Sequence, residues 1–342
     1  MSGSDRTSPG RRRVARSALL LLLSTFVALA GGEVVLVVLG RYPPPRYPPH
    51  TRRPDLYESY EDYGYRLHPN LRTSYEYPED DPRTLELVAN SDGFRDAREL
   101  REPDTRPRIM IVGDSFVFGE GVEAAERFPD ILETRLAGWR VDNLGMVGYG
   151  PDLMLRAFES VGRQANPDVV ILGIYTDDFR RLGPYYAGAG FQIPRYELDE
   201  GRLVTIPYPK PRIWNRLRLY EGFRQIRWSM TRSSWRLSEA ILDRFVELSG
   251  EDGFDLVIVF LPGDRDTPVD QTRRRWLADF SADSELRYRD LTDVIHEQPR
   301  REVFIAGNWH LNPSGHALVA EALHRMLSEE GLVSPTGSET PR

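Results

Sequence analysis

Apolar and polar positions alternate in blocks from residue 108 to the end of the chain. Strands are predicted at 108–112 and 139–144, and continuous apolar runs, typical of strands buried on both faces, at 168–175 and 255–261. Apolar residues at helical spacing predict helices at 124–136, 152–164, within 214–248, and at 313–328. This order of elements predicts right-handed βαβ units and a three-layer α/β/α sandwich around a parallel sheet.

The first apolar run of the chain has a different character, because it is long and has no polar face. Residues 18–40 contain a single charged side chain, Glu33, and about 20 apolar residues suffice to cross a bilayer. Five arginines and one aspartate precede the run, which favours a cytoplasmic amino terminus and a main domain on the other side. The sequence therefore predicts an uncleaved transmembrane anchor. A cleaved signal peptide ending at Ala30, followed by secretion, is the alternative.

The remaining segments are predicted from their composition. Residues 1–17 form a basic cytoplasmic tail, and the proline-rich residues 41–55 form an extended linker. We expect residues 56–106 to form an irregular extension with one edge strand at 84–89. Residues 107–330 are the main domain, 180–215 an insert with little helical signal that serves as a lid or substrate wall, and 331–342 a disordered tail.

Composition excludes several classes of function. The 342 residues carry a formal net charge of −7, and the positive charge gathers at the amino terminus, so a basic nucleic-acid footprint is missing. The chain has no cysteine, which removes disulfides, thiol catalysis and cysteine-ligated zinc. A phosphoryl-transfer or metal-dependent reaction has no glycine-rich phosphate loop or His/Glu cluster to support it, so no metal or cofactor is expected.

Four short blocks carry the candidate chemistry. Residues 109–121, IMIVGDSFVFGEG, run from a buried strand into Gly-Asp-Ser, and a serine there projects into the crevice where α/β sheets bind ligands. Gly-Asp-Ser alone fits an ordinary turn equally well. The other blocks are residues 143–150 (NLGMVGYG), 169–179 (VVILGIYTDDF) and 308–316 (NWHLNPSGH). Ser115 is the candidate nucleophile, and His310, just ahead of the last helix, is the candidate base.

In this order and spacing, the four blocks resemble the SGNH/GDSL hydrolase superfamily, and the lead-in at 90–96 resembles its membrane-anchored members. The resemblance implies a flavodoxin-like α/β/α fold and a serine ester hydrolase. It also implies that His310 is catalytic and His316 structural. For the oxyanion donors it indicates the backbone N–H of Ser115 and of a glycine in the second block, Gly145 first and Gly148 second.

The chain departs from the family at two positions. Relatives have an asparagine in the third block that donates to the oxyanion, whereas this chain has Asp177, followed by Asp178. An ionised carboxylate cannot donate a hydrogen bond. Relatives orient the histidine with an aspartate two residues before it, and here that residue is Asn308. Asparagine can accept from the imidazole but supplies no charge, and the loss of such an acid can cost about 10⁴ in turnover.

Two functional hypotheses remain open. The first is a membrane-anchored, outward-facing esterase or O-acyltransferase that acts on acyl esters, envelope glycans among them, through Ser115, His310 and Asn308. Its oxyanion site would include Ser115, Gly145 and Asp177. The second is a catalytically weak or inactive domain of the same fold that binds an envelope polymer or partner.

Overall fold

The computed structural model describes residues 9–41, 53–77, 83–183, 193–206, 217–230 and 233–333. Most of the predicted linker, residues 184–192 and 207–215 of the predicted insert, and the predicted carboxyl-terminal tail from residue 334 lie outside the described residues, as do residues 1–8 of the basic tail. The predicted disorder and lid role therefore stay predictions.

A five-stranded parallel sheet forms the centre of the main domain. Its strand order is β11-β10-β7-β5-β6, and every neighbouring pair is parallel. The strands are β5 (Arg108–Gly113), β6 (Arg140–Gly145), β7 (Val169–Ile174), β10 (Asp255–Phe260) and β11 (Arg287–Asp290). The sequence predicted the first four. It missed β11, an edge strand whose sequence Arg-Tyr-Arg-Asp has no apolar run.

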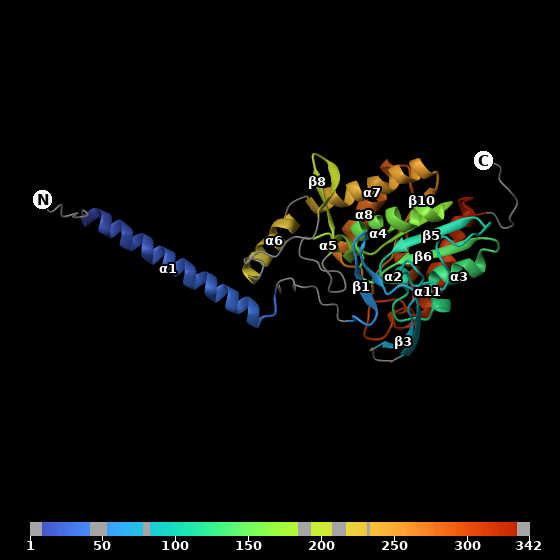
Figure 1. The fold of residues 1–342 in the computed structure, drawn as a ribbon, viewed down its shortest axis with the longest axis horizontal. Helices are drawn as coiled ribbons and strands as arrows, with labels where there is room; N and C mark the ends of the chain where they lie inside the picture. Colours follow the sequence, from blue (N-terminus) through green and yellow to red (C-terminus); the bar gives the residue numbers. More distant parts are fainter. Residues whose placement is uncertain are drawn as a thin grey trace.

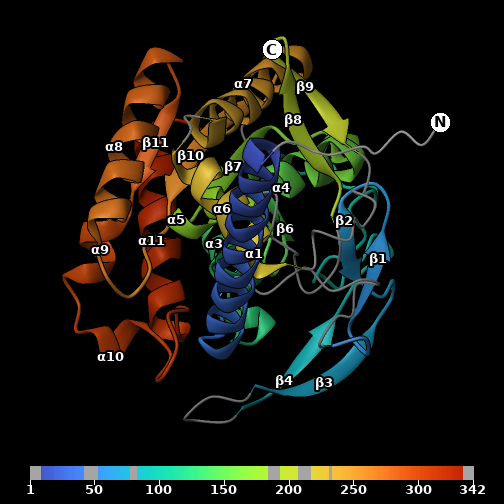
Figure 2. The same cartoon turned by 90° about the vertical axis from the view of Figure 1, so that its left-hand side faces the viewer.

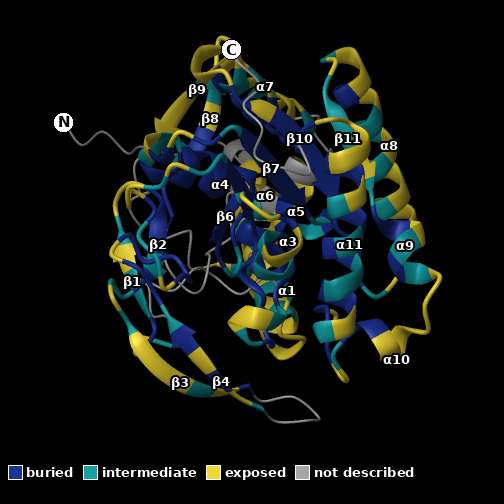
Figure 3. Ribbon diagram, turned by 90° about the vertical axis from the view of Figure 1, so that its right-hand side faces the viewer, coloured by how far each residue is buried: buried dark blue, intermediate teal, exposed yellow. Residues whose placement is uncertain are grey.

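Successive residues of the central strands face two separate hydrophobic clusters. On one face, Met110 and Val112 of β5 pack with α4 (Pro151–Ala157), α7 (Ser233–Asp252) and α8 (Pro268–Asp283). On the other face, Ile109 and Ile111 pack with α3 (Phe128–Arg135), α9 (Thr292–His296) and α11 (Pro313–Glu329). Figure 3 shows the buried residues gathered on the central strands, between helices with exposed outer turns. The predicted three-layer α/β/α sandwich is confirmed.

The predicted helices are present, with differences at their ends. The region 152–164 begins as α4 and continues through a π-helical turn, η2 (Phe158–Gly162), and a 3₁₀ turn, η3 (Arg163–Ala165). The region 214–248 is divided between α6 (Arg218–Met230) and α7. The last helix begins as predicted, because the Asn312 side chain accepts from Gly315 N–H at 3.0 Å and Pro313 occupies the first helical position.

The extension before the main domain is more regular than its sequence predicts. The expectation of irregular structure over 56–82 is wrong, because it contains β1 (Tyr57–Tyr60), β2 (Gly64–Leu67) and β3 (Arg72–Tyr77). β1 pairs with β2, and β3 pairs with β4 (Arg83–Val88), both antiparallel. Figure 2 shows these hairpins on one flank of the domain, away from α8 and α9. Tyrosine side chains such as Tyr63 and Tyr65 are buried there, so aromatic packing replaces a clear alternation of apolar residues.

The described part of the predicted insert also holds a hairpin, β8 (Arg195–Asp199) with β9 (Arg202–Ile206).

At the amino terminus, α1 (Pro9–Val38) projects away from the domain (Figure 1). Its residues Arg16–Val38 are long and apolar enough to cross a membrane, and none of this stretch is buried in the protein. This helix fits either a membrane anchor or a signal sequence.

Candidate active site

Ser115 lies where β5 ends and a short helix, α2 (Ser115–Phe118), begins. Gly113 is required at this turn, because a Cβ there would approach the Val117 side chain to 2.2 Å. Asp114 caps α2 by accepting from Phe116 N–H at 2.9 Å. Ser115 is therefore held in one orientation at the carboxyl edge of the sheet, with 3% of its surface exposed.

His310 reaches Ser115 from the loop between α10 (Arg300–Val303) and α11. A bridge between Phe304 and Leu311 closes this loop, and Ile305 N–H donates to the His310 carbonyl. His310 Nε2 lies 2.8 Å from Ser115 Oγ. The two residues stand within the hydrogen-bond reach that a base and a nucleophile require, although 195 positions separate them in the sequence.

Asn308 holds the other side of the imidazole. Its Oδ1 lies 2.8 Å from His310 Nδ1 and also accepts from the backbone N–H groups of Trp309 and His310. Its Nδ2 donates to Tyr77 Oη at 2.7 Å. Because Oδ1 accepts these backbone hydrogen bonds, the amide orientation is fixed, and Nδ1 of the neutral imidazole carries the proton. Nε2 is then free to accept the Ser115 proton.

A carboxylate that the sequence analysis missed also reaches this site. Glu120 Oε2 lies 3.4 Å from His310 Nε2, on the same side of the ring as Ser115. Glu120 stands in the loop after α2, and this loop is held by Arg95, whose guanidinium donates to the carbonyls of Gly119 and Val122 at 2.7 and 2.8 Å. Burial, and then the charge of Arg127, lowers the pKa of Arg95 to about 10.

This contact gives the lead-in at 90–96 a structural role. Arg95 is the arginine of that segment, and it ties the segment to the loop that follows the Gly-Asp-Ser turn. The sequence places Glu120 five residues after Ser115, inside the block already singled out. Only the left-handed turn at Gly119, with φ of 75°, directs the chain so that this carboxylate returns to the histidine.

The second block packs tightly against α2. Asn143 Nδ2 donates to the Val117 carbonyl at 2.7 Å, and its Oδ1 accepts from Gly145 N–H at 2.8 Å. A Cβ at Gly145 would lie 2.4 Å from Phe118 N, so only glycine fits. The N–H of Gly145 is thus already engaged by Asn143. Gly148, the second glycine considered, stands in the following loop with φ of 80°.

The third block places its two aspartates in different surroundings, both in the first turn of α5 (Thr176–Arg181). The Asp177 side chain is 40% exposed and pairs with Arg180 at 2.7 Å. Asp178 is fully buried and accepts from Tyr175 N–H at 2.8 Å. Arg181 Nη1 bridges Asp178 and Asp114, and also donates to the Tyr149 carbonyl.

Burial, and then the neighbouring Asp114 carboxylate, raises the pKa of Asp178 well above its usual range, and Arg181 opposes this rise. Arg181 therefore offsets one of the two negative charges that the buried aspartate pair would carry if both were ionised. Among the described residues, no group of three or more His, Asp or Glu side chains is placed to hold a metal ion.

The contacts described for His316 are with Phe128, and Ser115 is not among them. His316 is buried in α11, stacks on Phe128, and lies with Nδ1 3.3 Å from the N–H of that residue. Burial, and then the charge of Arg127, lowers its pKa to about 3. A neutral imidazole that accepts a backbone hydrogen bond is what a structural histidine requires.

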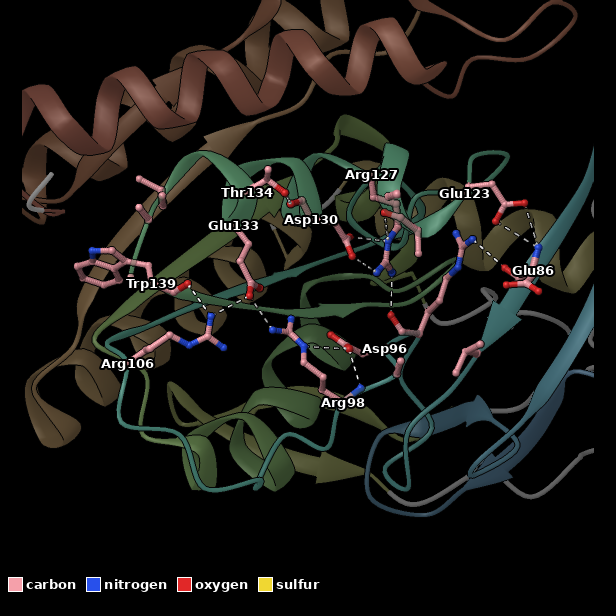
Figure 4. A pocket seen from close by; sticks show the side chains of 18 residues that line it. Glu86, Asp96, Arg98, Arg106, Glu123, Arg127, Asp130, Glu133, Thr134 and Trp139 are labelled. Carbon is pink, nitrogen blue, oxygen red and sulfur yellow. Dashed lines mark hydrogen bonds and ion pairs between the residues drawn. The ribbon is translucent and has the colours of Figure 1, made fainter. Parts of the chain in front are cut away.

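A groove of about 760 Å³ lies between α3 and the segment before β5, with Arg95 and Arg127 among its lining residues. Figure 4 shows its charged side chains directed at one another: Arg98 and Arg106 reach Glu133, and Arg127 reaches Asp130. Ser115 and His310 are not among its lining residues. These internal ion pairs explain the polar lining without any ligand.

The fold and the site together define an α/β protein with serine, histidine and asparagine hydrogen-bonded in series at the carboxyl edge of a parallel sheet. No family model matches the chain, and no curated protein sequence matches it.

Several solved structures are similar to it. A lipase/acylhydrolase from Enterococcus faecalis has 15% sequence identity and a TM-score of 0.43, covering 68% of this chain and 100% of that chain. The psychrotrophic esterase EstA from Pseudoalteromonas sp. has 13% identity and a TM-score of 0.44, covering 66% and 98%. A member of the lipolytic protein G-D-S-L family from Veillonella parvula DSM 2008 has 16% identity and a TM-score of 0.42, covering 65% and 98%. The assignment of a reaction to this chain rests on the site itself.

Proposed function

We propose that the protein is a serine ester hydrolase of the SGNH/GDSL type, anchored in the membrane by α1. One observation carries the proposal. His310 lies 2.8 Å from Ser115 through Nε2 and 2.8 Å from Asn308 through Nδ1, the geometry that activates a serine nucleophile. The four sequence blocks that resemble this superfamily support it independently.

The proposed reaction begins with attack of Ser115 Oγ on the carbonyl carbon of an acyl ester, while His310 Nε2 takes the hydroxyl proton. The tetrahedral intermediate collapses when His310 returns this proton to the leaving alkoxide, which departs as an alcohol. An acyl group then remains on Ser115. Water, activated by His310, releases it as a carboxylic acid, and a second hydroxyl in place of water would make the same step an acyl transfer.

The charge of the imidazolium needs a partner in this mechanism. Asn308 orients the ring but is neutral, so it cannot supply the charge that an aspartate supplies. Glu120, 3.4 Å from Nε2, supports a different solution, in which the negative charge stabilises the imidazolium from the serine side. A negative charge on the serine side of the ring also disfavours the negative charge that develops on the oxyanion, so we expect a slower enzyme than one with an aspartate at position 308.

The proposed oxyanion donors begin with the backbone N–H of Ser115, the first residue of α2, where helical N–H groups have no partner within the helix. For the second donor we keep the two glycines of the second block, Gly145, whose N–H donates to Asn143, and Gly148 in the following loop. Asp177 would contribute only as a protonated acid, since a carboxylate repels the oxyanion.

The full-length protein in detergent provides the test. It should release 4-nitrophenol from 4-nitrophenyl acetate, and Ser115→Ala should reduce the rate to background. Ser160→Ala is a matched control, because the Ser160 hydroxyl donates to Asp62 at the surface. Equal rates for the wild type and Ser115→Ala would refute the serine mechanism.

The location is part of the proposal. Arginines before the apolar stretch of α1 favour a cytoplasmic amino terminus, which would put Ser115 outside, near envelope glycans that carry acyl esters. We expect the protein to sediment with membranes and protease added to spheroplasts to digest the main domain. A soluble protein that begins at Gly31 would instead indicate a cleaved signal peptide.

The second candidate function is an envelope-binding domain of the same fold with little turnover. Asp177 in place of an amide donor, together with the neutral Asn308, favours it. If the wild type and the variants Asn308→Asp and Asp177→Asn all stay at the Ser115→Ala background on several acyl esters, this candidate replaces the esterase.

A further inference from the structure

Glu33 is the only charged side chain within the apolar residues 18–40, and the structure gives it a partner. Its carboxylate accepts from the backbone N–H groups of Arg218 and Leu219, at 2.8 and 3.0 Å. These are the first residues of α6. Glu33 therefore caps a helix that lies 185 positions later in the sequence.

The position of Glu33 fixes the depth of this contact. The apolar stretch ends at Val38, five residues after Glu33, so the cap lies about 7 Å inside the end of the span along the helix axis. A charged side chain within a span is costly unless it is paired or lies near the interface. The start of α6 would then lie at the boundary between the lipid tails and the headgroups.

One face of α6 is apolar and continues beyond the contact with α1. Leu219, Phe223 and Ile226 lie at helical spacing on this face. Leu219 packs at Gly32 of α1, where a Cβ would lie 3.5 Å from its methyl groups. The next two residues point outward, with 62% of Phe223 and 49% of Ile226 exposed, while Glu221 on the opposite side is buried.

The surroundings of this face match the outer edge of a bilayer. Leu217, just before α6, is 48% exposed, and Arg227 is exposed beside Phe223, placed for a lipid phosphate. Arg218 also ties the end of α1 to α6 by donating to the Arg41 carbonyl at 2.7 Å. Figure 1 shows α6 between the carboxyl end of α1 and the main domain.

We propose that α6 is an interfacial helix, docked to α1 by the Glu33 cap, whose Phe223 face inserts into the outer leaflet of the bilayer. It holds the main domain close to the membrane surface. This inference rests on the proposed anchoring by α1, because only a bilayer around α1 brings lipid to the face of α6.

The chain has no cysteine, so single-cysteine variants can carry an environment-sensitive probe at chosen positions. The full-length variants Phe223→Cys, Leu22→Cys and Val269→Cys are labelled with a nitrobenzoxadiazole dye and reconstituted into vesicles of phosphatidylcholine and phosphatidylglycerol. Leu22 lies within α1, and Val269, 57% exposed on α8, reports the aqueous side. Nitroxide lipids labelled near the headgroup or deep in the acyl chain quench the dye according to its depth.

At position 223 we expect about threefold stronger quenching than at 269, with the shallow nitroxide more effective than the deep one. Position 22 should show the opposite depth order. Quenching at 22 but not at 223 overturns the interfacial helix and leaves the anchor standing, whereas no quenching at either position refutes the anchor itself. A blue-shifted but unquenched probe at 223 means that protein covers it, which also overturns the inference.

A second set of variants tests the cap. Glu33→Leu should lower quenching at 223 toward the value at 269, because the start of α6 loses its acceptor. Glu33→Gln, which keeps an oxygen acceptor, should have a smaller effect. Ser24→Leu is the matched control, since the Ser24 hydroxyl donates to the Leu21 carbonyl within α1. Quenching at 223 that is unchanged in Glu33→Leu would refute the docking role of Glu33.

Discussion

The two positions where the chain departs from the SGNH/GDSL motif differ in how they are held. Asn308 is almost fully buried, and both ends of its amide are hydrogen-bonded, to His310 and to Tyr77. Asp177 is 40% exposed, and the bond described for it leads to Arg180 on its own helix. Asn308 belongs to the hydrogen-bonded series with His310 and Ser115, whereas the contact described for Asp177 lies within α5.

This difference bears on whether the two departures compensate each other. Relatives have Asn where this chain has Asp177, and Asp where it has Asn308. A compensating pair would be expected to share a contact, but the contacts described for these two residues lead to different partners. Negative charge near the imidazole comes instead from Glu120. We therefore expect the two positions to act independently, and unequally, on turnover.

The largest expected effect is the loss of the base. His310→Gln should lower kcat/KM for 4-nitrophenyl acetate by about a thousandfold, because Ser115 loses its proton acceptor. His68→Gln, a half-exposed histidine in the extension, should leave the rate unchanged. If the two variants had equal activity, the catalytic series would not include position 310.

Asn308→Asp should raise kcat by about tenfold or more, with a ceiling near 10⁴ set by the value of the acid in a serine protease. The site accepts the change, because an aspartate can receive the same N–H groups through one oxygen and the Tyr77 hydroxyl through the other. Steady-state kinetics measure the gain. A fall in kcat with the fold retained would show that Asn308 is the better partner here.

Glu120→Gln should lower kcat by about tenfold, because the imidazolium loses a charge that is only partly screened by solvent. In the Asn308→Asp background the loss should be smaller, since an aspartate then supplies charge on the Nδ1 side. A double-mutant cycle measures this coupling. An equal loss in both backgrounds would mean that Glu120 does not act on the imidazolium.

Asp177→Asn should raise kcat by only a few-fold. One oxyanion donor lowers the activation free energy by roughly 3 to 4 kcal/mol in a well-studied protease, and the expected gain is well below that limit. The Asp177 side chain is partly exposed and pairs with Arg180, so we do not expect it to hold one fixed position beside the oxyanion. Combined with Asn308→Asp, the gains should multiply. A gain equal to that of Asn308→Asp would break the contrast between the two positions.

The smallest effect on turnover is expected at the second histidine of the block. His316→Gln should change kcat at neutral pH by less than about twofold, since Gln can still accept from Phe128 N–H.

The free energy of unfolding, unlike turnover, should depend on His316 through its dependence on pH. Because burial lowers the pKa of His316 to about 3, the unfolded state binds its proton first, and stability falls as pH drops below about 6.5. At pH 5 the loss is about 2 kcal/mol. Denaturant titrations at pH 7 and pH 5 measure it, and an equally steep acid loss in His316→Gln would exclude this histidine as the cause.

The sequence predicted the layers of the fold and the residues that meet at Ser115, because strand runs and motif spacing are local signals. In the extension, alternation at 84–89 predicted β4. The edge strand β11 and the strands β1, β2 and β3 carry no such signal, since their stability depends on burial of tyrosines against distant segments. Glu120 was missed for a related reason. Its return to His310 depends on a left-handed turn at Gly119 and on Arg95, which holds the loop from outside the motif.

The central claim is that His310 and Asn308 activate Ser115 as a nucleophile, and covalent labelling tests it most directly. The full-length protein is treated with a fluorescent fluorophosphonate, and the rate of adduct formation is compared among wild type, Ser115→Ala and Asn308→Asp. We predict an adduct on Ser115 in the wild type, faster labelling in Asn308→Asp, and none in Ser115→Ala. Labelling that persists in Ser115→Ala, or that is absent from both the wild type and Asn308→Asp, would contradict the claim.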